Sequence, residues 1–332
     1  MLKIETKQVE SPQFESSPPP ASERRQRLEK PTGVYPIRIW WEYVGVLTVI
    51  HVTALYAFWP WLFSWVGVAS IVVGHHLFGM FGITVGYHRM LTHRSFQCRK
   101  WLEHTFAVLG VCCLQDTPAR WVATHRVHHQ HSDHREDPHT PLVNFMWAQF
   151  GWLTLKDHNF GKMAHLDRYA RDIVRDPFYL WLERGQNGLF VFLAHAVVIY
   201  LIGGAIGWSY GGWPEAWRMS WSLLVWGVAV RTVVVWHLTW AVNSITHIWG
   251  YRTFETNDDS RNNWLIGYFT HGEGWHNNHH AWPTAAAHGQ NWWEFDLSYR
   301  VIWLLEMVGL AWDVSRPDTK RKQKQKDEQA AA

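Results

Sequence analysis

The chain has 332 residues, of which 47% are hydrophobic, 25 are Trp and 22 are His. Its formal net charge of +3 is too small to favour a nucleic-acid partner, and its three cysteines fit neither a disulfide framework nor a zinc motif. The mean hydropathy of −0.22 excludes a chain that is apolar throughout, so we expect a membrane part combined with a water-exposed part.

The two ends of the chain differ in composition from the rest. Residues 1–35 are rich in Ser, Pro, Glu and Arg and lack the apolar core of a signal peptide, which predicts a disordered and uncleaved tail. Residues 317–332 are basic, and we expect a second disordered tail there. One domain is expected between the tails, over residues 36–316.

The first apolar stretch runs from Tyr43 to Tyr87 and contains no Asp, Glu, Lys or Arg. A single membrane helix needs about 20 residues. The stretch therefore predicts two spans, at about 43–63 and 65–87, with a turn near Pro60. A soluble protein with buried helices is the alternative, and a charge-free run of this length disfavours it.

The second apolar stretch runs from Asn187 to about Val242. It is interrupted at 208–214, where Gly and Pro occur together and favour a turn. We expect two further spans on either side of this turn, at about 187–207 and 219–242.

Four spans place both termini on one side of the membrane. Basic residues are concentrated in the two tails and in 89–185, whereas the turns on the other side carry only Glu215 and Arg218. The positive-inside rule then puts the termini in the cytoplasm. The expected fold class is all-α, a multi-pass four-helix transmembrane bundle with a cytosolic helical cap.

Arg231 falls within the fourth span, where a charge is costly, and the sequence identifies no partner for it.

Histidines form four clusters near the cytoplasmic ends of the spans: His88-Arg-Met-Leu-Thr-His93, His125-Arg-Val-His128-His129, Asn243-Ser-Ile-Thr-His247 and His276-Asn-Asn-His279-His280. Residues spaced i, i+3 and i+4 lie on one face of a helix. Each cluster can therefore direct several imidazoles at one point. We expect these clusters to meet in the folded chain and to carry the active site.

Nine histidines in four clusters exceed what one metal ion can bind. A zinc site takes about four ligands, so nine imidazoles predict two ions with four or five ligands each. Imidazole suits Fe, Cu, Zn and Ni, and the absence of thiolates favours a two-metal redox site over structural zinc. Asn243 is expected to hold a metal-bound water.

Most of the other histidines are expected to be ordinary, partly buried polar residues: His51, His75, His76, His104, His158, His165, His195, His237 and His288. Four more lie beside the clusters and are interpreted as neighbours of the ligands or as incidental: His131, His134, His139 and His271.

The sequences HRMLTH, HRVHH, NSITH and GEGWHNNHH resemble the histidine boxes of the membrane fatty acid desaturases of the stearoyl-CoA delta-9 type, over about residues 40–315. The resemblance implies an O₂-dependent enzyme that inserts a cis double bond, with delta-9 as the expected position. It also implies two non-haem iron ions and an Asn243 near the second of them. The implied iron ligands are His88, His93, His125, His128, His129, His247, His276, His279 and His280.

One departure from the animal acyl-CoA enzymes concerns the acyl carrier. Those enzymes have an Arg-Asp pair before the second box, where this protein has Ala123 and Thr124. The sequence HSDHREDPH is more similar to the bacterial and cyanobacterial branch, some members of which act on acyl chains already in membrane lipids. The substrate is therefore expected to be a fatty acyl-CoA or an acyl-lipid.

The expected chemistry needs a metal because an unactivated C–H bond in the middle of an alkyl chain offers nothing to acid–base side chains. No flavin, nucleotide or cytochrome b5 motif is visible, so electrons are expected from a separate ferredoxin or cytochrome b5.

Two alternatives stay open: a membrane hydroxylase of the same metal class, and a non-catalytic metal- or lipid-binding membrane protein. A zinc hydrolase is disfavoured because no HExxH helix occurs, which leaves Glu273 only as a carboxylate beside the ligands.

Overall fold

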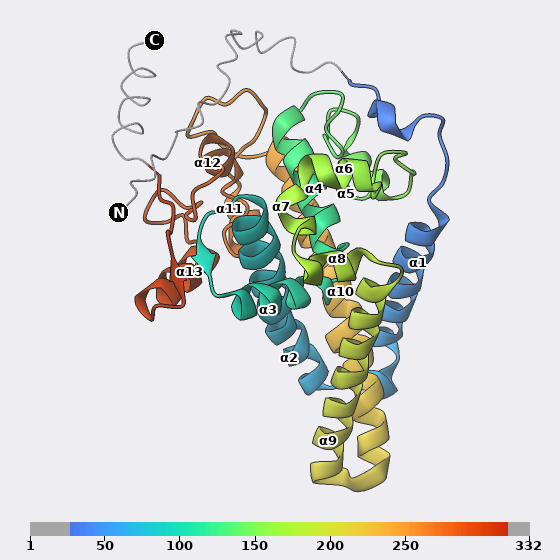
Figure 1. Ribbon diagram of the computed structural model, residues 1–332. Helices are drawn as coiled ribbons and strands as arrows, with labels where there is room; N and C mark the ends of the chain where they lie inside the picture. Colours follow the sequence, from blue (N-terminus) through green and yellow to red (C-terminus); the bar gives the residue numbers. More distant parts are fainter. Residues whose placement is uncertain (1–26, 318–332) are drawn as a thin grey trace.

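The structure is a computed structural model that describes residues 27–317. Its regular structure is mostly helical, with long helices extending from a broader part made of short helices (Figure 1). In the described residues, two short strands, β1 (Gln97–Cys98) and β2 (Ala311–Trp312), form an antiparallel ladder that joins the segment after the first histidine box to the end of the domain.

Three stretches of the described residues are long and apolar enough to cross a membrane: Trp41–Phe58, Trp65–Thr92 and Asn187–His247. The first is mainly α1 (Trp41–Leu55), followed by the short 3₁₀ turns η2 (Tyr56–Phe58) and η3 (Pro60–Leu62). The turn expected near Pro60 is confirmed, since α1 and the next helix run in opposite directions from it (Figure 1).

The second stretch joins α2 (Trp65–Gly74) to the π-helical segment η4 (His75–Thr92). Ser64 begins α2 by accepting a hydrogen bond from the backbone N–H of Gly67 at 2.8 Å. The helix continues five residues beyond the predicted end at 87, so His88 of the first histidine box lies within the helical segment and His93 directly follows its last residue. Wide π-helical turns are frequent at functional sites.

The third stretch contains α9 (Asn187–Leu223), the π-helical η6 (Leu224–Val230) and α10 (Arg231–Ser244). The chain reverses within α9 at Gly212, whose φ of +62° suits glycine, and the two arms return side by side (Figure 1). A Cβ at Gly207 would overlap the carbonyl oxygen of Glu215. The break predicted at 208–214 is therefore confirmed.

Arg231, for which the sequence identified no partner, is fully buried between the helices. Its guanidinium donates to the carbonyl oxygen of Cys112 at 2.8 Å and lies 3.0 Å from Nε2 of His195. It also stands over the ring of Phe78, 4.5 Å from the centroid. The charge is thus satisfied by the bundle interior, and His195 is a partner of Arg231 rather than an isolated histidine.

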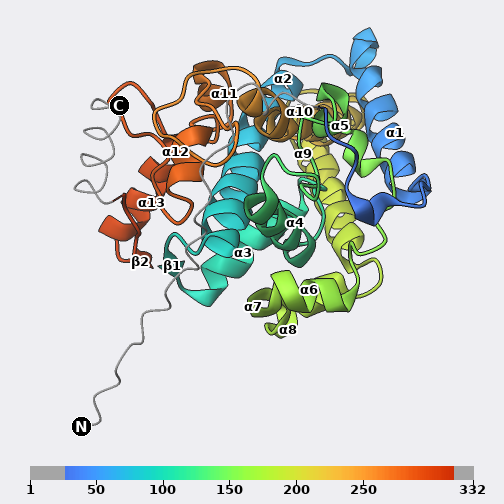
Figure 2. The ribbon, with the colours of Figure 1, turned by 90° about the horizontal axis from the view of Figure 1, so that it is seen from above.

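Short helices and loops form the broad part of the molecule. Seen from above, α4 and α12 flank the upper end of η4 (Figure 2). The main core packs Tyr87, Phe106, Val122 and Ile302 together, from four separate elements. The remaining elements are α3 (Lys100–Val111), α4 (Pro118–His131), α5 (Phe145–Gln149), η5 (Gly151–Leu153), α6 (Met163–Tyr169), α7 (Arg171–Val174), α8 (Pro177–Glu183), η7 (Ile245–His247), α11 (Trp264–Phe269), α12 (His276–Ala281) and α13 (Leu297–Met307).

Residues 27–35, which we assigned to the N-terminal tail, are packed against the domain. Leu28 donates its backbone N–H to the carbonyl oxygen of Leu142 at 2.9 Å, and Val34, in the 3₁₀ turn η1 (Thr32–Val34), is buried. The expected boundary at residue 35 therefore does not mark the start of packing. The rest of that tail, and the basic tail from 318 onwards, lie outside the described residues.

Candidate metal centre

The nine box histidines meet in two neighbouring groups. Within each group, one ring nitrogen of every member lies within 4.8 Å of the corresponding atoms of the others. The five-histidine group consists of His88, His93, His125, His129 and His279. The four-histidine group consists of His128, His247, His276 and His280. All four clusters predicted from the sequence therefore come together.

Two helices supply ligands to both groups. In α4, His125 and His129 face the five-histidine group, while His128 faces the other. In α12 the division is reversed, because His276 and His280 join the four-histidine group. In each helix the histidines at i and i+4 therefore face one group, and the histidine at i+3 faces the other group. The expectation that all histidines of one cluster point at the same site is therefore wrong for α4 and α12.

Carboxylates lie against the outward-facing Nδ1 of four of the nine box histidines in the described chain. An imidazole that donates from Nδ1 to a carboxylate keeps its other nitrogen bare and more basic, as in many metal sites. Among the described residues three such hydrogen bonds occur: His128 with Asp137 at 3.0 Å, His247 with Asp133 at 2.8 Å and His280 with Asp258 at 2.7 Å. Nδ1 of His88 lies 2.6 Å from Oε2 of Glu273 as an ion pair.

The inward-facing nitrogens fit a bound cation. Nε2 of His276 lies 3.1 Å from Nε2 of both His247 and His280. In the tautomers in which His247 and His280 donate from Nδ1 to the aspartates, their Nε2 atoms carry lone pairs that face His276. Nε2 of His128 is buried and has no hydrogen-bond partner. Converging lone pairs repel one another unless a positive ion lies between them, so the donor set suits a metal.

Burial keeps the imidazoles of His125, His129 and His279 in the five-histidine group neutral. Loss of solvent, reinforced by neighbouring imidazoles, holds the pKa of His125, His129 and His279 well below the ordinary value of 6.5. Burial alone would raise the pKa of Asp133, but His247 and the backbone N–H of Asp259 lower it to about 2. At neutral pH His125, His129 and His279 are therefore unprotonated, and Asp133 is a charged acceptor.

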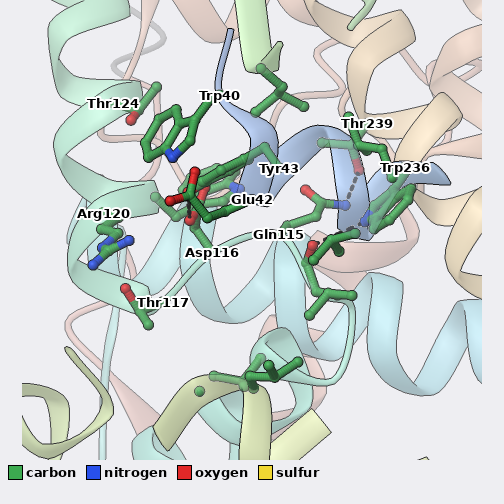
Figure 3. A pocket seen from close by; sticks show the side chains of 18 of the residues that line it. Trp40, Glu42, Tyr43, Gln115, Asp116, Thr117, Arg120, Thr124, Trp236 and Thr239 are labelled. Atoms are coloured by element: carbon green, nitrogen blue, oxygen red, sulfur yellow. Dashed lines mark hydrogen bonds between the residues drawn. The ribbon is translucent and has the colours of Figure 1, made fainter. Parts of the chain in front are cut away.

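A cavity of about 340 Å³ leads to the histidines (Figure 3). Its outer end is bordered by exposed Glu42 and Gln186, and its inner end by His125 and Asn243. Apolar and aromatic side chains dominate the middle: Val46, Leu47, Val111, Leu114, Trp121, Trp152, Leu153, Trp236 and Trp240. A smaller cavity of about 50 Å³ shares four lining residues with the first: Trp121, His125, Thr239 and Asn243. The two spaces therefore adjoin beside His125 of the five-histidine group.

Comparison with known proteins identifies the family. The family profile described as fatty acid desaturase matches residues 64–311. The chain belongs to the fatty acid desaturase family. It is accordingly an oxidoreductase that desaturates fatty acyl chains, and its long apolar helices associate it with a membrane.

Curated relatives of this desaturase match along most of their length. The sn-1 stearoyl-lipid 9-desaturase of Anabaena variabilis is 42% identical over 272 residues, which cover 82% of this chain and 92% of that protein. The sn-2 palmitoyl-lipid 9-desaturase of Nostoc sp. (strain 36) is 41% identical, over 82% of this chain and 88% of that protein. An acyl-CoA C20 Delta5-desaturase of Anemone leveillei is 40% identical, over 83% and 81% respectively.

Asn243, the predicted holder of a metal-bound water, borders both cavities of the desaturase next to His125. Asn243 lies in α10, four residues before His247, which belongs to the four-histidine group. Its role at the metal stays a prediction.

The expectation that His288 is an ordinary, partly buried polar residue is wrong. Its ring centroid lies 4.4 Å from that of His279, and its Nδ1 is 3.3 Å from Glu273. The side chain is 1% exposed, and burial lowers its pKa to about 4. No spacing in the sequence points to His288, because an irregular loop after α12 carries it back to the ligands.

The four histidines beside the boxes occupy different positions. His139 is buried, with its ring centroid 4.5 Å from that of His128, and borders the large cavity. His271 borders the small cavity, where it packs on His75 at 4.3 Å between centroids. His75 is therefore not isolated either. His131 is partly exposed and His134 exposed, and neither belongs to a histidine group.

Proposed function

We propose that the chain is an acyl-lipid delta-9 desaturase that uses two non-haem iron ions, held by the five- and four-histidine groups, to place a cis double bond in a saturated acyl chain. The observation that carries this proposal is that two adjoining cavities reach both histidine groups: His125 of the five-histidine group lines both cavities, and His276 of the four-histidine group lines the smaller one. The names of two similar cyanobacterial proteins, both lipid 9-desaturases, support the position and the substrate.

The metal would be held by the nine imidazoles, with Asn243 beside it. When bound, two irons together with O₂ supply the oxidising power that removes one hydrogen from each of two adjacent carbons. The balance is one saturated chain, one O₂, two electrons and two protons giving one unsaturated chain and two waters. We propose a separate carrier, a ferredoxin or a cytochrome b5, as the source of the electrons.

The protein's part in the reaction is to hold the acyl group in one register and to exclude water. Gln115 donates from Nε2 to the hydroxyl oxygen of Thr239 at 3.0 Å, across the inner part of the cavity (Figure 3). Trp121 lies against His125, with 5.0 Å between ring centroids. A substrate that enters past Leu47 would meet this constriction next to the metal ligands, which would fix the carbons that react.

The charge at the outer end of the cavity favours a lipid over CoA as the carrier. CoA is polyanionic and needs basic partners. Arg120 is the only Arg or Lys among the described residues that line this cavity, and it donates to Glu183 at 3.0 Å. Glu42 and Asp116 line the same end. A CoA phosphate would therefore meet an acidic surface, whereas a lipid can present its acyl chain from the membrane beside α1 and α9.

We propose that the three apolar stretches cross the membrane four times. The reversal at Gly212 supports this proposal, because it lets the long third stretch cross twice. All nine histidines and the elements of the broad part would then lie on the side that carries the basic residues, which is the cytoplasmic side.

The direct test is expression of the protein in a desaturase-deficient host that supplies reduced ferredoxin. Wild type is expected to produce monounsaturated chains with the bond at delta-9, and the label from a short pulse of radioactive stearate should appear as oleate first in membrane lipids. The His128→Ala, His279→Ala double variant, which removes one ligand from each group, is the inactive control.

Three other results would contradict parts of the proposal. Oleoyl-CoA that is labelled before any lipid would identify CoA as the carrier. Hydroxy fatty acids would assign the hydroxylase alternative, which shares the metal class. An absence of product from a protein that binds two irons and receives electrons would contradict desaturation itself.

A further inference from the structure

The carboxylates around the two histidine groups are unevenly distributed. Only one ligand of the five-histidine group, His88, has a carboxylate at its Nδ1 within the part of the chain that the structure describes, and that carboxylate belongs to Glu273. Three of the four ligands in the other group have one: His128 with Asp137, His247 with Asp133 and His280 with Asp258. Negative charge is therefore concentrated around the four-histidine group.

The two sets of carboxylates also differ in how their charge is balanced. Arg89, which is fully buried, donates to Oε1 of Glu273 from Nε at 3.1 Å and from Nη2 at 3.0 Å. Its guanidinium therefore opposes the charge beside the five-histidine group. Within residues 27–317, Asp133, Asp137 and Asp258 form ion pairs with histidines and with no Lys or Arg.

The aspartates are held in place by further hydrogen bonds. The carboxylate of Asp133 accepts from the backbone N–H of Asp259 at 2.8 Å and from the hydroxyl of Thr140 at 2.9 Å. Asp258 accepts from the backbone N–H of Ser260 at 3.0 Å. These carboxylates therefore keep their orientation toward the imidazoles. Buried anions need compensation, and neutral imidazoles supply it only in part.

We infer that Asp133, Asp137 and Asp258 make the four-histidine group the tighter of the two iron sites and the one whose iron is oxidised at the lower potential; this inference rests on the proposed di-iron function. A carboxylate at Nδ1 makes the opposite nitrogen a stronger ligand. Fixed negative charge also stabilises Fe³⁺ more than Fe²⁺, because the attraction grows with the charge of the ion. The three aspartates are thus positioning residues that act through histidines.

The test uses the purified full-length protein loaded with Fe²⁺ under anaerobic conditions and challenged with the chelator ferrozine. Wild type is expected to release its iron in two phases, one ion in each. Asp258→Asn keeps the size of the side chain and removes its charge, so the slow phase should become faster by about 10- to 100-fold. Glu273→Gln is the matched control at the other group and should leave the slow phase unchanged.

A redox titration of the same proteins gives an independent readout. Wild type should show two midpoint potentials, of which Asp258→Asn raises the lower and Glu273→Gln does not. Asp258→Glu restores the charge and should restore the slow phase, which separates an electrostatic role from a folding defect, and Asp133→Asn should act like Asp258→Asn.

Release of both wild-type irons in a single phase would overturn the inference. An Asp258→Asn variant with an unchanged slow phase and an unchanged lower potential would also overturn it. A wild-type protein that binds no iron would instead contradict the proposed function, so the two failures are distinguishable.

Discussion

Most of the candidate ligands in this protein have a contact at one or both of their ring nitrogens. The i, i+4 spacing predicts correctly which two imidazoles of α4 and of α12 face the same group, whereas the i+3 histidine of each helix faces the other group. The outward contacts do not follow from the sequence. Asp258 lies 22 residues before His280 and Asp133 lies 114 residues before His247, so only the folded chain brings each pair together.

The partners of Arg231 were likewise not predictable from the sequence, and they lead to a prediction about stability. Arg231→Met removes hydrogen bonds from a charged donor to Cys112 and His195, and each such bond contributes about 1.5–3 kcal/mol. We expect the free energy of unfolding in detergent micelles to fall by at least that amount. Arg316→Met, which breaks an exposed ion pair with Glu306, should change it by about 1 kcal/mol or less. Equal stability of the two variants would contradict the structural role of Arg231.

At the level of elements, hydropathy predicted the long apolar helices, because a charge-free apolar run of this length has few other uses. The turn near Pro60 was predicted from the length of a single span, and the turn within 208–214 from the Gly and Pro residues there. The π-helical geometry of η4 and η6 was not predicted, since no local pattern distinguishes it from α-helix. The short helices of the broad part were not predicted individually either, because tertiary packing rather than periodicity determines where each one ends.

The two antiparallel arms of α9 approach each other closely at Gly207. This close packing gives a second prediction. Gly207→Ala places a Cβ against the backbone of Glu215, which has no side-chain freedom to yield. We expect a loss of about 1–3 kcal/mol in the free energy of unfolding, as for other overpacked sites. Gly45→Ala is the control, because a Cβ there meets nothing within 4 Å and should leave stability equal or slightly higher. Thermal unfolding of both variants in micelles measures the difference, and an unaffected Gly207→Ala would contradict the close packing.

The helix α1 provides a matched pair of positions for testing the cavity. Leu47 lines the large cavity, whereas Val49 is 61% exposed on the outer surface of the same helix. Leu47→Trp should fill the acyl path and lower product formation at least about tenfold, because one misplaced contact can cost that much in orientation. Val49→Trp should retain near wild-type activity. Both should keep two irons per protein, and an active Leu47→Trp would contradict the assignment of the cavity.

At the scale of the whole molecule, the site exists only because four segments spread over nearly two hundred residues converge. The sequence predicted that convergence from the common side of the membrane, and it predicted the nine histidines individually. It did not predict the division into five and four, because α4 and α12 each serve both groups. It also gave no indication of His288, which reaches the centre through an irregular loop.

The buried imidazoles predict how the metal-free protein responds to acid. Burial holds the pKa of six of them well below 6.5: His93, His125, His128, His129, His276 and His279. The unfolded chain therefore binds more protons than the folded chain as the pH falls below about 7, and stability is lost in that direction. The melting temperature of metal-free protein should fall from pH 8 to pH 5.5, and a rise on acidification would contradict the burial of these histidines.

The central claim is that nine histidines hold two irons in two separate groups, and iron content per protein molecule tests it most directly. Purified wild type is expected to contain two irons, measured by mass spectrometry against protein concentration. His276→Ala, in the four-histidine group, and His125→Ala, in the five-histidine group, should each contain about one, and the double variant should contain almost none. Two irons in every single variant, or the loss of both irons from either one, would contradict two separately held metal sites.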